Sequence, residues 1–289
     1  VLISTRRLVG IQVINDGQQV ICLPGATLDR LEKELVPFNR EPHSVIGSSC
    51  IGASVLGGVC NNSGGALVRR GPAYTELALY ARVNDDGQLE LVNHLGVNLG
   101  ETPEEILSKL ETKNYQIGDI INNSGCCASD HRYGHDVKQV DENTPARFNA
   151  DPSRLYEASG SAGKVCVFAV RLDTFEKIPS QVFYVGTNSH DDLTEIRRFL
   201  LKDLPRLPIA GEYIHRVAYD IGAEYGKDTF MFIEKLGTAK VPAAFAMKDK
   251  VDAYLEKFGM KGLSDKVLQL ITKFLPNHLP KRMNVFRDL

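Results

Sequence analysis

The sequence predicts an α+β fold in two domains, residues 1–172 and 173–289. A length of 289 residues is enough for two domains of ordinary size. Hydrophobic residues make up 43% and charged residues 24%, which is typical of a globular chain. Stretches with two-residue alternation are interleaved with stretches of helical period, and this mixture predicts both strands and helices. In the second domain we expect helices on an antiparallel sheet.

The first elements form a hairpin followed by a helix. Asn15-Asp16-Gly17 separates two apolar runs, and this order of residues is typical of a turn between paired strands. Thr27 then predicts a helix start, because its side chain can accept a hydrogen bond from the first turn. Leucines at positions 28, 31 and 35 give that helix one apolar face.

A second pair of strands and a second helix follow. Alternating apolar residues at 77, 79, 81 and 83 predict a strand, and Asp86-Gly87 predicts the turn that returns the chain through Leu89 and Leu91. Thr102 and Pro103 predict the next helix start, with Glu105 completing a capping box. Residues 111–149 lack an apolar period, so we expect a long loop there.

The rest of the chain continues the mixture of elements. We expect helices over residues 151–160 and 192–202, and strands over residues 164–172, 181–185 and 230–233.

Composition and pattern exclude several classes of protein. A formal net charge of -2 is unlike that of a general nucleic-acid binder, so we expect no nucleic-acid partner. The longest apolar run is much shorter than the ~20 residues of a membrane-spanning helix. The first residue is Val1 within an apolar run, which predicts a strand cut in its middle and not a signal peptide. We therefore expect an internal fragment of a longer protein.

The cysteines and histidines indicate no metal centre. No two cysteines form a C-x-x-C pair, so reduced thiols are expected. His131 and His135 have helical spacing, but Gly134 and the polar surroundings argue against a helix, and no third ligand follows. We predict no metal ion, and we assign no chemistry to His43 or His215. The cysteines are residues 22, 50, 60, 126, 127 and 166.

An uncharged, glycine-rich stretch between residues 46 and 65 is the main functional candidate. Its small residues would let the backbone approach a flat or anionic ligand, and its N–H groups could donate to phosphate oxygens. Neither a G-x-G-x-x-G fingerprint nor a complete P-loop is present. From composition alone, a cofactor cradle and a small-residue helix packed on a sheet are equally good interpretations.

A resemblance favours the cradle. The order of motifs is similar to that of the FAD-binding (PCMH-type) domain of the vanillyl-alcohol-oxidase-type flavoproteins, and it is closer still to the respiratory, quinone-linked D-lactate dehydrogenases of bacteria. The resemblance runs through the whole chain. Its clearest segments are residues 41–49 (EPHSVIGSS), 70–76 (RGPAYTE), 144–147 (TPAR), 149–152 (NADP) and 225–230 (YGKDTF).

This resemblance implies the site residues of a partial PCMH-type FAD domain followed by part of a substrate or cap domain. FAD would contact Gly47, Ser54, Gly57, Gly64 and the backbone of Val167. The first phosphate loop of the family would lie before residue 1, and its catalytic base, expected to be a histidine, would lie beyond Leu289. We therefore assign no catalytic residue. Residues 110–142 depart from the family pattern.

The function that the resemblance implies is oxidation of D-lactate to pyruvate, with electrons passing through FAD to a membrane quinone. The protein would lie on the cytoplasmic side of the bacterial inner membrane, in contact with its lipids. Another FAD-dependent 2-hydroxy-acid or alcohol oxidoreductase and a non-catalytic module are the alternatives. A nicotinamide dehydrogenase is disfavoured by the missing fingerprint.

The C-terminal region is basic. Residues 246–289 carry nine Lys or Arg against five Asp or Glu, a net charge of +4, whereas residues 1–245 carry -6. The helix expected after Ser264 has an apolar stripe, which more often packs into a core than lies on an anionic membrane. The resemblance favours the membrane.

Overall fold

The computed structural model describes residues 4–44, 52–64, 66–122, 124–143, 151–161, 163–237 and 240–275. The chain divides into two compact units. Unit 1 comprises Val1–Ile178 and Arg198–Gly211, and unit 2 comprises Pro179–Arg197 and Glu212–Leu289. Unit 1 contains both helices and strands, whereas the described residues of unit 2 form helices.

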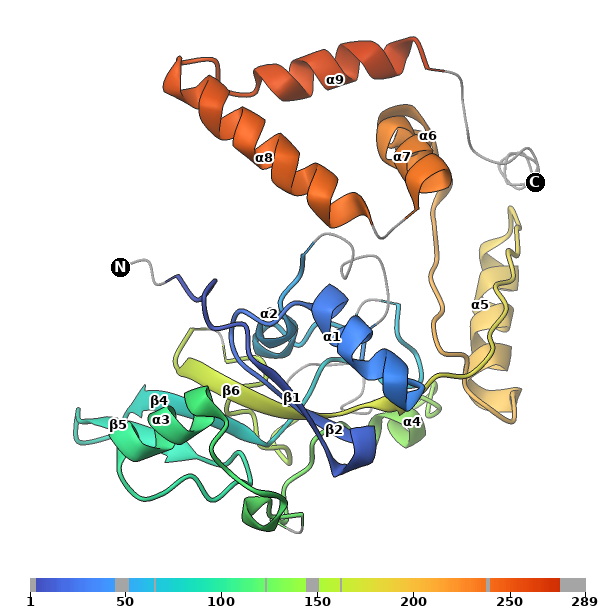
Figure 1. Cartoon of the computed structure of the whole chain (residues 1–289). Coiled ribbons are helices and arrows are strands. Elements are labelled where there is room, and N and C mark those ends of the chain that lie inside the picture. Colours follow the sequence, from blue (N-terminus) through green and yellow to red (C-terminus); the bar gives the residue numbers. More distant parts are fainter. Residues whose placement is uncertain are drawn as a thin grey trace. The chain divides into compact units, whose positions relative to one another are not determined.

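An antiparallel sheet forms the centre of unit 1 (Figure 1). Its five strands lie in the order β1-β2-β6-β4-β5, so β6 returns from late in the chain to pair with both β2 and β4. Long-range pairing of this kind ties the two ends of unit 1 together. The strands are β1 (Ile11–Ile14), β2 (Gln19–Cys22), β4 (Ala78–Val83), β5 (Leu89–Asn93) and β6 (Cys166–Asp173).

Helices cover both faces of this sheet. The helices α1 (Leu28–Leu35) and α2 (Val55–Cys60) pack on one face, and α3 (Pro103–Thr112) packs on the other (Figure 1). Successive strand residues point to opposite faces, so neighbours in one strand enter different cores. In β6, for example, Val170 belongs to the core under α1 and α2, and Ala169 to the core under α3.

The predicted hairpin is confirmed. The strands β1 and β2 pair in antiparallel register, with Ile14 opposite Gln19. Asn15, Asp16 and Gly17 between them have φ angles of 51°, 52° and 85°. Asn, Asp and Gly tolerate this left-handed region better than other residues, which is why this tripeptide marks the turn.

The helix starts are also those expected, with one correction. Thr27 Oγ1 accepts the N–H of Arg30, and Thr102 Oγ1 accepts the N–H of Glu105, each at 3.3 Å. The prediction of a capping box at α3 is wrong, because Glu105 Oε2 accepts the N–H of Glu101 and not that of Thr102. The same carboxylate pairs with Lys109 one turn later.

Residues 151–160 contain no helix, contrary to the sequence prediction. The Asp151 carboxylate does not start a helix here. It accepts hydrogen bonds from the backbone and hydroxyl of Ser153 and from Arg154 Nε, which hold the chain in a turn. The smaller elements of unit 1 are η1 (Asn15–Gly17), η2 (Val36–Phe38), β3 (Arg40–Glu41), η4 (Ile117–Asp119), α4 (Tyr133–Asp136), β7 (Phe175–Glu176) and the π-helical turn η6 (Phe199–Asp203).

The described residues of unit 2 form helices and no strand. Residues 181–185 have no regular structure, and residues 230–233 lie within α7, so both expected strands are wrong. The apolar run 230–233 is short and could fit either element, and the ten-residue interval between Gly226 and Gly237 accommodates a helix. The helices are α5 (His190–Arg198), which ends in unit 1, α6 (Arg216–Tyr225), α7 (Lys227–Leu236), α8 (Val241–Lys257) and α9 (Leu263–Lys273).

Unit 2 exposes much apolar surface. The stripe on α9 is open, with Val267 and Ile271 about half exposed and the Phe274 side chain just after it 82% exposed. The interpretation of this stripe as a core face is therefore wrong for the residues that the structure describes. Within those residues, no helix is long and apolar enough to cross a bilayer.

The cysteines that the structure describes are free thiols, as expected. They are Cys22, Cys60, Cys126, Cys127 and Cys166.

Candidate functional site

The described part of the glycine-rich stretch, residues 52–64, begins as a strand-like segment and continues into α2. Ser54 Oγ accepts the N–H of Gly57 at 3.1 Å, which caps the helix. Ala53 accepts the N–H of Leu28, and the N–H of Val55 donates to Ala26, both at 2.9 Å. The start of α2 is thereby fixed to the start of α1.

Gly64 lies where the chain passes close to its own backbone. A Cβ at this position would be 3.0 Å from Pro72 Cα and 3.2 Å from Pro72 N. Beside this contact, the N–H of Ala73 donates a hydrogen bond to the Ser63 carbonyl at 2.8 Å. A side chain at Gly64 would therefore displace residues 71–73.

The segment 52–64 has the properties that a flat, anionic cofactor would need. It contains no charged side chain. A Cβ on Gly52 would meet no atom within 4 Å, and one on Gly58 would only touch Ala73 Cβ at 4.0 Å. Within the described part of the chain, the buried Oδ1 of Asn62 has no hydrogen-bond partner. Buried polar atoms usually have a hydrogen-bond partner, so this oxygen is available to accept a hydrogen bond from a bound group.

Four of the five residues expected to contact a cofactor lie within the described residues, and three gather on one face of the sheet. Ser54 caps α2 and Gly57 lies within it, and the apolar residues of this helix share a core cluster with the partly buried Val167 of β6. Gly64 follows α2 at the approach to Pro72. Gly47 lies outside the described residues. Their contacts with a cofactor remain a prediction.

The strand that carries Val167 contains a bulge. Tyr80 pairs with Val167, but its neighbour Leu79 pairs with Ala169, so Phe168 is the extra residue of β6. A bulge of this kind bends its strand and changes the direction of the side chains and carbonyls beside it. The irregularity thus falls next to the position whose backbone we expect to face the cofactor.

Arg70 is a residue whose role the sequence did not reveal, although it belongs to the motif that carries the resemblance. Its guanidinium is buried, and Nη1 donates to the carbonyls of Pro42 and His43 at 3.0 and 3.1 Å. It also pairs with Glu41 and stacks 4.2 Å above the centre of the Phe175 ring. Arg70 therefore connects the chain after Gly64 to the residues that lead into the glycine-rich stretch.

His43 lies beside this arginine in a buried position. Burial, and next the positive charge of Arg70, lower its pKa from 6.5 to about 4, although the backbone of residues 70–72 partly opposes this. The imidazole is therefore neutral at pH 7. A base with so low a pKa is poorly matched to proton abstraction at neutral pH.

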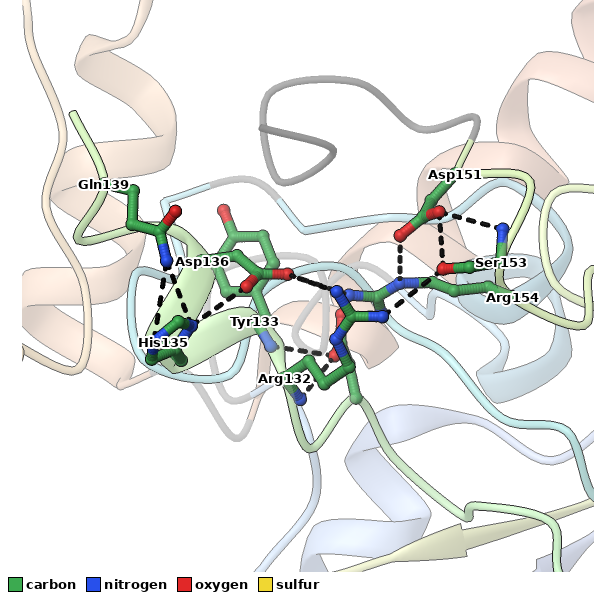
Figure 2. A network of polar contacts seen from close by, with 9 residues as sticks. Arg132, Tyr133, His135, Asp136, Gln139, Asp151, Ser153 and Arg154 are labelled. Carbon is green, nitrogen blue, oxygen red and sulfur yellow. Dashed lines mark hydrogen bonds and ion pairs between the residues drawn. The ribbon is translucent and has the colours of Figure 1, made fainter. Parts of the chain in front are cut away.

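A second polar network lies between α4 and residues 151–154 (Figure 2). Arg154 is its centre, because its guanidinium forms ion pairs with Asp130, with Asp136 at 3.7 Å and with Asp151 at 3.2 Å. Arg132 also belongs to this network, because its guanidinium lies 3.6 Å from the Asp136 carboxylate. Three carboxylates share two arginines here, so the network is nearly neutralised and holds the loop in place.

The two histidines considered for metal binding have other contacts. His135 lies in the short helix α4, so the expectation that Gly134 would prevent a helix is wrong, but His131 lies before it. His135 Nδ1 is 3.1 Å from Asp136, and His131 Nε2 is 3.4 Å from Asp173. Over the residues that the structure describes, no three His, Cys, Asp or Glu side chains are grouped so that they could hold a metal ion.

Comparison with known proteins first defines the class. Residues 182–289 match a protein family described as "D-lactate dehydrogenase, membrane binding". This stretch includes nearly all of unit 2.

The individual relatives are more specific. The whole chain is 60% identical to a quinone-dependent D-lactate dehydrogenase of Haemophilus influenzae, 57% identical to one of Escherichia coli and 46% identical to one of Corynebacterium glutamicum. In each case the chain spans about half, 51%, of the relative's length. The resemblance to the quinone-linked D-lactate dehydrogenases is thus confirmed: over its full length, the chain is similar to about half of three such proteins.

Proposed function

We propose that this chain is part of a flavoenzyme that oxidises D-lactate to pyruvate and delivers the electrons to a membrane quinone. The observation that carries this proposal is the 46–60% identity, over the whole of this chain, to three proteins named for that activity. The match covers 100% of the chain, so it extends through both units.

The coenzyme that we propose is FAD, held by backbone groups and small side chains. FAD would accept a hydride from the C2 carbon of the substrate when bound, which is chemistry that protein side chains cannot supply. The residues proposed to contact it are Gly47, Ser54, Gly57, Gly64 and the backbone of Val167. Asn62 Oδ1, which lacks a donor among the described residues, supports this placement.

In this proposal the chain holds the coenzyme, and no described residue is assigned as the base that accepts a proton from the substrate. Ser54 caps the first turn of α2, and Gly64, four residues after the helix, packs closely against Pro72. Arg70 holds residues 41–43 and thereby positions the entry to the glycine-rich stretch. His43 is too weak a base for the proton-accepting role.

We further propose that unit 2 associates with the cytoplasmic face of the inner membrane as a peripheral domain, where it contacts lipids. Its helices expose aromatic and aliphatic side chains, among them Phe258 on α8 and Ile271 on α9. Lys266 and Lys273 lie beside the apolar stripe of α9, and such a combination suits the interface of an anionic bilayer.

Substrate-dependent bleaching tests the proposed function. The full-length enzyme that contains this chain is expected to purify with a flavin absorption band in the visible blue. D-lactate added without oxygen should bleach that band, because the flavin is reduced, whereas L-lactate should leave it unchanged. A colourless protein that takes up no FAD would contradict the proposal. Bleaching only by another 2-hydroxy acid or an alcohol would favour the alternative oxidoreductase.

A further inference from the structure

A shallow, open pocket lined by cationic residues lies in unit 1. Its volume is about 410 Å³, and it is lined by Arg69, Gly134, Lys138, Arg206 and Leu207. Three of these five residues are positively charged, and none is acidic. No residue of the stretch 46–65 takes part, so the pocket goes beyond the coenzyme site proposed above.

The pocket is built by three segments that meet through the backbone. Residues 66–68 and 209–211 pair like short strands, with Val68 N–H donating to Ile209 and Gly211 N–H donating to Ala66, at 3.0 and 2.8 Å. The third segment is α4, which approaches so closely that a Cβ on Gly134 would be 3.6 Å from the Arg69 carbonyl. The positions of the lining residues are therefore set by the fold.

Arg69 is held rigidly. Its Nε and Nη2 donate to the Leu207 carbonyl at 3.1 and 2.7 Å. A guanidinium anchored on one edge in this way retains donors for a ligand while losing little conformational freedom when it binds.

The charges in the pocket are not neutralised by the protein. Across the described residues, Lys138 and Arg206 form no ion pair. Two acidic residues close to Lys138 in sequence are engaged elsewhere: Asp141 accepts from both nitrogens of Arg198 at 2.5 and 2.8 Å, and Asp136 pairs with Arg132. Three cations that share one pocket without a carboxylate repel one another, and an anion bound there would remove that cost.

We propose that this pocket binds a phosphate group. Three cationic lining residues match a phosphate dianion better than the single charge of a carboxylate, and Arg69 can donate two parallel hydrogen bonds to phosphate oxygens. The phosphate could belong to a lipid headgroup or to a soluble phosphate compound, and the chemistry of recognition is the same for both.

Calorimetric titration of the full-length enzyme that contains this chain with inorganic phosphate tests the proposal without D-lactate. The variant Lys138→Gln/Arg206→Gln should bind phosphate at least about tenfold more weakly than the wild type, because each change removes a charge-assisted hydrogen bond. Lys164→Gln/Lys177→Gln is the matched control, since it removes two exposed lysines of unit 1 and the same charge. Lys138→Arg should retain binding.

Vesicle sedimentation separates the two sources of phosphate. If binding to phosphatidylglycerol vesicles weakens in Lys138→Gln/Arg206→Gln but not in the control, the phosphate belongs to a lipid headgroup. If only the titration with inorganic phosphate is affected, the ligand is a soluble phosphate compound. The proposal is overturned if the wild type does not bind phosphate, if both double variants bind it equally well, or if D-lactate binds the pocket and phosphate does not.

Discussion

Replacing Arg171 by leucine is expected to lower the free energy of unfolding by about 1–3 kcal/mol, because the hydrogen bonds of a buried guanidinium are lost. Arg171 is only 1% exposed and lies in β6. Its guanidinium donates to Gln19 Oε1, to the carbonyls of Gly96 and Ile121 at 3.0 Å each, and to Asn122 Oδ1 at 2.9 Å. Leucine would remove all of these hydrogen bonds; Asn15 Nδ2 would still donate to Gln19 Oε1 and Asn122 Oδ1, and the N–H of Ile121 to the Gly96 carbonyl, so the Ile121 carbonyl would lose its donor.

The matched control is Arg82→Leu. Arg82 lies in the neighbouring strand β4, and its ion pair with Glu90 is on the surface. Exposed pairs contribute little to stability, so only a small loss is expected. Urea unfolding followed by circular dichroism measures both variants. Equal losses in the two would contradict the role assigned to Arg171.

The second large effect is a loss of folding stability at acidic pH. His43 has a pKa lowered to about 4 in the folded state against an ordinary value of 6.5, so the unfolded chain binds the extra proton between these two values. Stability from the neutral imidazole is therefore complete above about pH 6.5 and is lost as the pH falls toward 4. At 1.4 kcal/mol per pH unit, the loss amounts to about 3 kcal/mol.

A difference measurement isolates this histidine from the carboxylates, which also titrate in acid. The unfolding free energies of the wild type and of His43→Leu are compared at pH 7, 5.5 and 4.5. We expect the gap between them to narrow or reverse as the pH falls, because only the wild type carries the titrating ring beside Arg70. A gap that does not change with pH would show that His43 is not buried next to this arginine.

Local signals predicted the local structure correctly. Asn15-Asp16-Gly17 and the caps Thr27 and Thr102 act within four residues, and each is found as expected. The errors arose where short patterns are ambiguous, as in residues 230–233, or where a partner distant in sequence decides. Asp151 looked like a helix start, and its carboxylate does accept the Ser153 N–H, but Arg154 pairs with Asp130 and Asp136, which are 24 and 18 residues earlier in the chain.

Some features of the candidate site could also be predicted from the sequence, and others could not. Lack of charge and of large side chains made the stretch 46–65 visible in the sequence. Arg70 was visible only as part of a motif, because its partners are 27–29 residues away and depend on how the chain folds back. The pocket of Arg69, Lys138 and Arg206 combines three segments that no local pattern connects.

The central claim is that the segment around α2 lies against a flavin dinucleotide, and the FAD affinity of Gly64→Val in the full-length enzyme tests it most directly. The matched control is Gly118→Val, where a Cβ would meet nothing within 4 Å and φ is not left-handed. Flavin-fluorescence titration is carried out well below the unfolding midpoint of each variant, measured without FAD. We expect Gly64→Val to bind FAD about tenfold more weakly, because its side chain displaces residues 71–73, and Gly118→Val to bind normally. Unchanged FAD affinity in folded Gly64→Val would contradict the account.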